Sequence, residues 1–236
     1  MISLKIHRLS LISGVLRAKG LTVVIDVFRA FTTAAYVMHN GAATIIPVET
    51  VEDAFKMKKE HPDWLLMGEV DGVKVEGFDY GNSPYEMKEL DFKGKTLIQR
   101  TSAGTQGIVL AQKADEIILG SFVTADAIVE YIIRSNPDIV SLVAMGWGGK
   151  EIALEDEYLS EYVEMKLQGR TPDFRKMKEK IRESQHGKKF FDPDKPQFVE
   201  GDFHAAMDLN RFNFVLRIRR KNGLRVEFVS ESQNGE

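Results

Sequence analysis

Residues 21–27 read Leu-Thr-Val-Val-Ile-Asp-Val, and this run is the strongest indication of the fold class. It is short, nearly continuous in apolar residues and rich in β-branched side chains, as in a parallel strand that is buried on both faces. A helical stretch follows at about 30–40 and is ended by Gly41. A buried strand leading directly into a helix is the repeating unit of α/β proteins.

The same alternation continues along the chain. Further buried strands are predicted at 43–48, 64–67, 96–99, 116–119 and 139–145. Helices are predicted from Thr50, which forms a capping box with Asp53, and at 84–90, 107–112 and 125–134. This rhythm predicts a three-layer α/β/α fold in which helices cover both faces of a mainly parallel sheet.

The character of the chain changes after Gly149. Helices are predicted at 154–167, 172–183 and 201–210, with a surface loop at 186–200. Strands at 214–219 and 224–229 flank the pair Asn222-Gly223, which is a strong signal for an antiparallel hairpin. Because no linker interrupts the pattern, we expect a single domain over residues 1–236.

Composition excludes several classes of function. The 236 residues contain no cysteine, which rules out thiol nucleophiles, thiolate metal sites and disulfides. A net charge of −3 gives no general attraction to nucleic acid or anionic lipid. No apolar run approaches the roughly 20 residues of a membrane span, and the N-terminus has no signal-peptide pattern. We therefore expect a cytoplasmic protein with no nucleic-acid or membrane partner.

Polar residues collect where the predicted strands end, and ligands bind at the carboxyl ends of parallel strands. After the first strand come Asp26, Arg29, Thr32 and Thr33, and after the third comes Glu69. Later turns carry Ser102, Gly104 and Thr105, then Lys150, then Glu155 and Asp156 at a helix start. Each turn alone has a structural alternative, namely capping of the following helix.

Residues 77–84, Gly-Phe-Asp-Tyr-Gly-Asn-Ser-Pro, combine two glycines with a carboxylate, an amide and a hydroxyl. Ser83 is a predicted N-cap, with Pro84 at the first helical position and Glu86 closing a capping box. A helix start preceded by a carboxylate and an amide suits a phosphate together with a divalent cation. The alternative is a well-capped structural turn.

Taken together, carboxylates are expected to meet at one edge of the sheet around Mg²⁺, which prefers hard oxygen ligands and shares its shell with water and phosphate. The candidate metal ligands are Asp26, Glu69, Asp79, Glu155 and Asp156. This composition is typical of a phosphoryl-transfer site.

In order along the chain, these segments resemble the 2-phosphosulfolactate phosphatase family. The matching pieces are 24–33 (Val-Ile-Asp-Val-Phe-Arg-Ala-Phe-Thr-Thr), Gly41-Ala42, Gly68-Glu69, 77–84, 101–105 (Thr-Ser-Ala-Gly-Thr), Gly120-Ser121-Phe122 and Leu154-Glu155-Asp156. The resemblance implies a three-layer α/β fold and Mg²⁺-dependent hydrolysis of the phosphate ester of a small anionic hydroxy acid, as in coenzyme M biosynthesis. It also implies self-association, for which Phe190, Phe191, Phe198 and Phe203 are candidates unless these rings pack on the core.

Four positions depart from the family pattern. Val70 replaces an Arg, Ala103 an Asn, Thr124 an Asn and Met145 a Cys. The loss of a cation and two amides bears most on substrate recognition.

The expected catalytic residues are Asp26, Arg29, Glu69 and Asp79, with Arg29 clamping the phosphate or the substrate carboxylate. The expected substrate-binding residues are Thr32, Thr33, Gly81, Asn82, Ser83, Ser102, Gly104, Thr105 and Lys150. The nucleophile is either a metal-activated water or Asp26.

Two other classes compete with this hypothesis. One is a non-catalytic α/β module that binds a phosphorylated metabolite. The other is a dinucleotide-binding oxidoreductase, which is disfavoured because no Gly-x-Gly-x-x-Gly follows the first strand.

Overall fold

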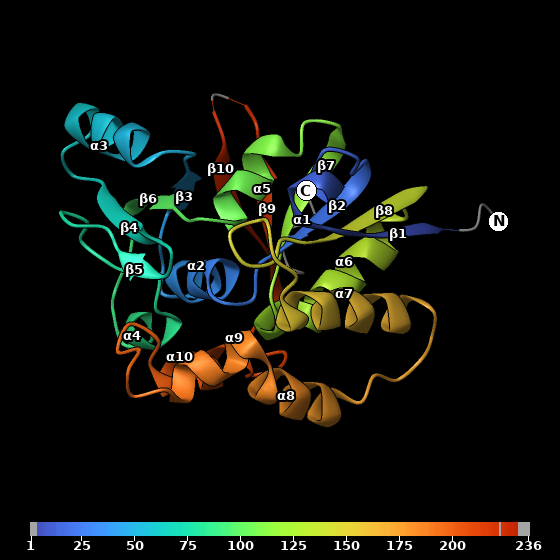
Figure 1. Cartoon of the computed structure of the whole chain (residues 1–236). Helices are drawn as coiled ribbons and strands as arrows, with labels where there is room; N and C mark the ends of the chain where they lie inside the picture. Colours follow the sequence, from blue (N-terminus) through green and yellow to red (C-terminus); the bar gives the residue numbers. More distant parts are fainter. Residues whose placement is uncertain (1–3, 222, 231–236) are drawn as a thin grey trace.

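The predicted first strand forms as β2 (Gly20–Ile25) and leads through a short turn into α2 (Ala30–His39). The computed structural model describes residues 4–221 and 223–230. Its ten-stranded sheet and surrounding helices confirm the α/β class (Figure 1). Among the described residues, no helix combines the length and apolar character needed to cross a membrane.

The sheet is ordered β1-β8-β2-β7-β9-β10-β3-β6-β4-β5. Its other strands are β1 (Lys5–Ser10), β3 (Thr44–Pro47), β4 (Leu65–Val70), β5 (Val73–Lys74), β6 (Thr96–Arg100), β7 (Ala114–Gly120), β8 (Ile139–Ala144), β9 (Phe214–Arg219) and β10 (Arg225–Ser230). Neighbours from β1 to β7 are parallel, as are β3, β6 and β4. The predicted C-terminal hairpin, β9 and β10, lies between these two parallel halves and pairs antiparallel with both. Asn222, part of the predicted turn, lies outside the described residues.

The hairpin reverses the strand direction between the two halves, so a flat sheet would point their carboxyl ends to opposite edges. Sheets twist by about 20–25° per strand, and six steps separate β2 from β4. The accumulated rotation of roughly 120–150° brings the two sets of carboxyl ends towards a common region. The pocket described below lies in that region.

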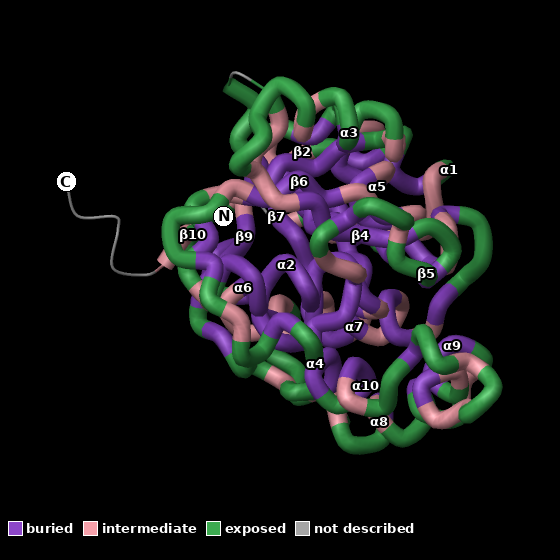
Figure 2. Tube along the Cα trace, turned by 90° about the vertical axis from the view of Figure 1, so that its left-hand side faces the viewer, coloured by how far each residue is buried: buried purple, intermediate pink, exposed green. Residues whose placement is uncertain are grey.

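Helices cover both faces. They are α1 (Leu11–Val15), α3 (Val51–Glu60), α4 (Pro84–Met87), α5 (Gly104–Leu110), α6 (Ala125–Ser135), α7 (Leu154–Leu167), α8 (Phe174–Glu183), α9 (Gln185–Lys188) and α10 (Glu200–Ala206), with 3₁₀ turns η1 (Phe122–Thr124) and η2 (Lys189–Phe191). Alternate residues of β2 pack against the helices on opposite faces of the sheet. Val24 packs with α2 and α5, whereas Val23 and Ile25 pack with α6 and α7. Buried residues accordingly concentrate in the central strands and in α2 (Figure 2).

The prediction of a surface loop at 186–200 is wrong in part. The segment contains α9 and η2, and His186, Phe190 and Phe198 are buried. Phe190 packs edge-on against Phe28, with ring centroids 4.7 Å apart, and against Phe198 at 5.7 Å. The Phe-rich segment therefore packs on the core, because burial of large rings outweighs the local Pro, Asp and Lys content.

Candidate active site

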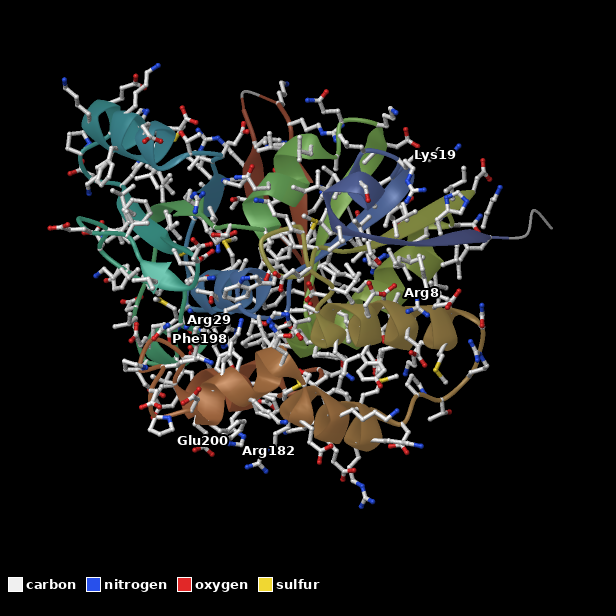
Figure 3. The ribbon with its side chains drawn as sticks, viewed as in Figure 1. Arg8, Lys19, Arg29, Arg182, Phe198 and Glu200 are labelled. Atoms are coloured by element: carbon white, nitrogen blue, oxygen red, sulfur yellow. The ribbon has the colours of Figure 1, made fainter. Side chains whose placement is uncertain are left out.

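A pocket opens where β2, β4, β6 and β8 end. Its polar wall consists of Asp26, Arg29, Glu69, Asp71, Asn82 and Ser102, and its other wall consists of Phe28, Gly72, Ala103, Gly146, Trp147, Gly148 and Phe198. Five of the polar residues predicted from sequence thus meet in one place, although they come from both halves of the sheet. In Figure 3, Arg29 and Phe198 lie close together above the C-terminal helices.

Asp26 lies at the end of β2, almost fully buried. Its Oδ1 accepts a hydrogen bond from the amide of Ala30 at 3.2 Å, and the amide of Gly104 binds the same carboxylate. A Cβ at position 104 would lie 2.8 Å from Asp26 Oδ2, so glycine is required for this close approach. Burial, together with the charge of Glu69, raises the pKa of Asp26 to about 7.

Glu155 and Asp156 begin α7 and are also buried. Asp156 accepts hydrogen bonds from the amides of Val27 and Gly146, both at 2.8 Å, and so joins the ends of β2 and β8. Glu155 Oε2 is buried without a hydrogen-bond partner. Burial and the neighbouring charge of Asp26 raise the pKa of Glu155 to about 8, and burial with the charge of Glu155 raises the pKa of Asp156 well above its ordinary value.

Glu69 organises two pocket loops. Its Oε1 accepts from the amide of Ser102 at 2.6 Å, and its Oε2 accepts from the amide of Gly72 at 2.6 Å. The hydroxyl of Ser102 in turn donates to Glu69 and accepts from the amide of Asp71. Glu69 therefore ties the end of β4 to the end of β6.

Arg29 reaches the pocket, but protein groups already hold its guanidinium. Nη1 donates to Asp202 Oδ2 at 2.7 Å and to the carbonyl of Gln197 at 2.9 Å, and Nη2 donates to the carbonyl of Gly72 at 2.9 Å. The ring of Phe198 lies 5.0 Å from the guanidinium carbon. This arrangement attaches the C-terminal segment to the pocket, which differs from the phosphate clamp expected from sequence.

The loop 77–84 contributes one residue to the pocket. Asn82 lines it, and its Oδ1 is buried without a partner. Ser83 is the N-cap predicted, accepting from the amide of Glu86 at 3.2 Å, and it also donates to Asp202 at 2.5 Å. Asp79 does not reach the pocket: its 38% exposed carboxylate accepts from the amide of Leu66 and lies 3.8 Å from Lys58 Nζ.

The remaining predicted binding residues do not line the pocket; they are Thr32, Thr33, Gly81, Gly104, Thr105 and Lys150. The hydroxyls of Thr32 and Thr105 donate to the carbonyls of Val27 and Thr101, so local backbone satisfies them. Lys150 is exposed.

Of the four departures from the family pattern, only Ala103 lines the pocket. Val70 is exposed on β4, whereas Thr124 and Met145 are buried in the core.

Sequence reasoning missed the apolar wall. Trp147 follows β8 between two glycines that adopt positive φ angles of 68° and 58°, and this Gly-Trp-Gly turn was the available signal. Phe198 reaches the pocket by packing over Gly72, where a Cβ would lie 2.4 Å from the Phe198 ring.

Within residues 4–221 and 223–230, no three Asp, Glu or His side chains form a cluster that could hold a metal ion by themselves. Mg²⁺ needs fewer protein ligands than three, since it usually takes one or two carboxylates and completes its octahedral shell with water and phosphate. Two observations are consistent with a Mg²⁺ ion at this position. Glu155 and Asn82 each have a buried side-chain oxygen without a hydrogen-bond partner, and the pKa of Asp26 is raised.

Known proteins resemble this chain over most of its length. The family described as 2-phosphosulpholactate phosphatase matches residues 6–221. A Bacillus subtilis protein named "Probable 2-phosphosulfolactate phosphatase" is 30% identical over 203 residues, covering 85% of this chain and 87% of its own. Two others of the same name are similar: one from Clostridium acetobutylicum, 41% identical over 60% of each chain, and one from Carboxydothermus hydrogenoformans, 45% identical over 50% of this chain and 49% of its own. The match thus spans about 60% of the length of the Clostridium relative.

Proposed function

The chain belongs to the 2-phosphosulfolactate phosphatase family, and we propose that it is a phosphoric monoester hydrolase acting on a small anionic hydroxy acid. The expected substrate is 2-phosphosulfolactate, as in coenzyme M biosynthesis. The observation that carries the proposal is a buried group of carboxylates. Asp26 and Glu69 line the pocket together with Asn82 and Ser102, and Glu155 and Asp156 lie near Asp26.

Mg²⁺ is the proposed cofactor. Asp26, with a second carboxylate from Glu69 or Glu155, would hold it, and Asn82 Oδ1 offers a further neutral oxygen. When bound, Mg²⁺ would neutralise charge on the phosphate oxygens and lower the pKa of a coordinated water. Its charge would also favour the ionised form of Asp26, which burial otherwise disfavours.

The protein's own groups would orient this site. The amides of Ala30 and Gly104 hold the Asp26 carboxylate, and Glu69 fixes the loop of Ser102. The rings of Trp147 and Phe198 contribute apolar surface to the pocket. The proposed attacking group is either a water molecule or the carboxylate of Asp26, each of which would lie beside the bound phosphate.

Phosphate release from 2-phosphosulfolactate, measured with Mg²⁺ and with EDTA, tests the proposal. Asp26→Asn should lower kcat by at least about a hundredfold, since it removes a charged group beside the reacting atoms. Asp79→Asn is the matched control, because Asp79 belongs to the same recognised motifs but lies outside the pocket; we expect its rate to stay within about threefold of wild type.

Equal losses in the two variants would show that Asp79 takes part in the reaction as well as Asp26, and would contradict the extent of the site given above. Binding of 2-phosphosulfolactate without phosphate release under any metal condition would instead indicate a non-catalytic module.

A further inference from the structure

The C-terminal segment brings a lysine to the apolar wall of the pocket. Lys189 begins η2, and its Nζ lies 3.4 Å from the centroid of the Trp147 ring and 5.7 Å from that of Phe198. Both rings line the pocket, and Lys189 contacts these rings without being a lining residue itself. The ammonium group is therefore held against the wall by two cation–π contacts.

His186 positions this lysine from one turn earlier. Its ring is stacked on Trp147, with an interplanar angle of 17°, and its Nδ1 lies 3.1 Å from Lys189 Nζ. Because an ammonium group can only donate, Nδ1 accepts, and the imidazole is neutral. Burial lowers the pKa of His186, which agrees with this assignment.

Lys189 lacks an anionic partner. Among the described residues, no carboxylate lies within the 4.0 Å ion-pair distance of its Nζ. Burial lowers the pKa of Lys189, the charges of Glu155 and Glu151 raise it, and the charge of Lys195 lowers it. A half-buried ammonium that has no ion-pair partner is in an unfavourable arrangement unless an anion joins it.

Two other cations near the pocket are paired with carboxylates, and Arg100 donates to the carbonyl of Glu69 and to the hydroxyl of Ser102. Arg29 is paired with Asp202 at 2.7 Å, and Lys195 is paired with Asp192 at 3.1 Å. The pocket itself is rich in carboxylates, so a substrate with two acid groups needs a cation beyond the one that binds its phosphate.

We propose that Lys189, supported by Trp147 and His186, binds the second acid group of the substrate, a sulfonate or a carboxylate. The inference rests on the proposed phosphatase function and names the residue that would recognise the acid group of the substrate other than its phosphate. Arg29, by contrast, fixes the segment that carries Lys189. Specificity then resides in a part of the chain that is remote in sequence from the carboxylates.

The test compares Lys189→Met with Lys188→Met, an exposed neighbouring lysine, on 2-phosphosulfolactate and on ethyl phosphate, which has no second acid group. Lys189→Met should reduce the preference for 2-phosphosulfolactate, expressed as a ratio of kcat/KM values, by about tenfold to a hundredfold, mainly through KM. Lys189→Arg should recover part of the preference, and Lys188→Met should keep the wild-type ratio. Equal losses on both substrates, or an unchanged ratio, would overturn the proposal.

A binding measurement separates this inference from the proposed function. Calorimetric titration with sulfolactate, which lacks the phosphate, requires no turnover. Weaker binding to Lys189→Met than to wild type and Lys188→Met supports the anion site even if no ester is hydrolysed. Equal binding to all three proteins refutes it even if hydrolysis is observed.

Discussion

Replacing Asp202 by Asn is expected to be strongly destabilising. The carboxylate is fully buried and accepts from Arg29 Nη1 at 2.7 Å, from Ser83 Oγ at 2.5 Å and from the amide of Tyr85 at 3.1 Å. Asn keeps the shape but removes the charge and turns an acceptor into a donor. The positive charge of Arg29, 5% exposed in its side chain, is then left uncompensated.

Breaking a buried ion pair by removing one partner costs about 3–5 kcal/mol of unfolding free energy. Arg29 retains the carbonyls of Gln197 and Gly72, so the lower half of this range is expected for Asp202→Asn. The double variant Arg29→Met/Asp202→Leu removes both charges. It should be destabilised by much less than the sum of the single variants Arg29→Met and Asp202→Leu, with a coupling of at least about 2 kcal/mol.

Urea denaturation followed by circular dichroism gives the four free energies of this cycle. Asp208→Asn is the matched control, because its ion pair with Arg211 is 3.9 Å long and about half exposed, and it should change stability by no more than about 1 kcal/mol. A loss below about 1 kcal/mol for Asp202→Asn, or additive changes in the cycle, would refute the structural role of Arg29 and would restore it as a free anion clamp.

Three further changes have defined outcomes. The pKa values of Asp26 and Glu155 are raised to about 7 and about 8, so the folded chain binds more protons than the unfolded chain between about pH 4 and pH 8. The urea midpoint should therefore fall as the pH rises through this window, and it should fall less steeply in Asp26→Asn and in the presence of Mg²⁺. A midpoint that does not change with pH would contradict the burial of these acids. Gly72→Ala should lower stability by about 1–3 kcal/mol in the same assay, because the residue has φ +84° and its Cβ would meet Phe198; a neutral effect would show that the pocket wall is not closely packed. Thr50→Ala should cost about 1 kcal/mol through loss of the N-cap of α3, whereas Thr50→Ser should be almost neutral, and equal effects would argue against capping.

The central strands could be predicted because they are buried on both faces, which produces uninterrupted apolar runs such as 21–27. The edge strand β1 was missed because its sequence, Lys-Ile-His-Arg-Leu-Ser, carries the charges of a strand that is partly exposed. The segments α9 and η2 were missed because they are short, and their burial depends on tertiary contacts of Phe190 rather than on local propensity.

The candidate site divides in a similar way. Asp26, Glu69, Asn82 and Ser102 could be found because each follows a predicted strand or lies in a motif, and strand ends meet in space. Asp79 shares that signal and nonetheless points away, since its carboxylate caps the amide of Leu66. Packing of the C-terminal segment brings together Trp147, Phe198 and Lys189. The hydrophobic periodicity of the sequence does not predict this packing.

The two charged residues in the segment Asp26-Val-Phe-Arg29 have different roles in the structure. The carboxylate of Asp26 lines the pocket near Glu69. The guanidinium of Arg29 holds the C-terminal segment through Asp202. Burying Asp26, Glu155 and Asp156 together disfavours their ionised forms, so the site is less stable at neutral pH than a neutral core would be. A cation on the carboxylate side and an anion beside Lys189 would offset both imbalances together. A magnesium-bound phosphate ester that carries a further acid group would supply both charges, so one proposed ligand would account for the acidic interior and for the lysine without an ion-pair partner.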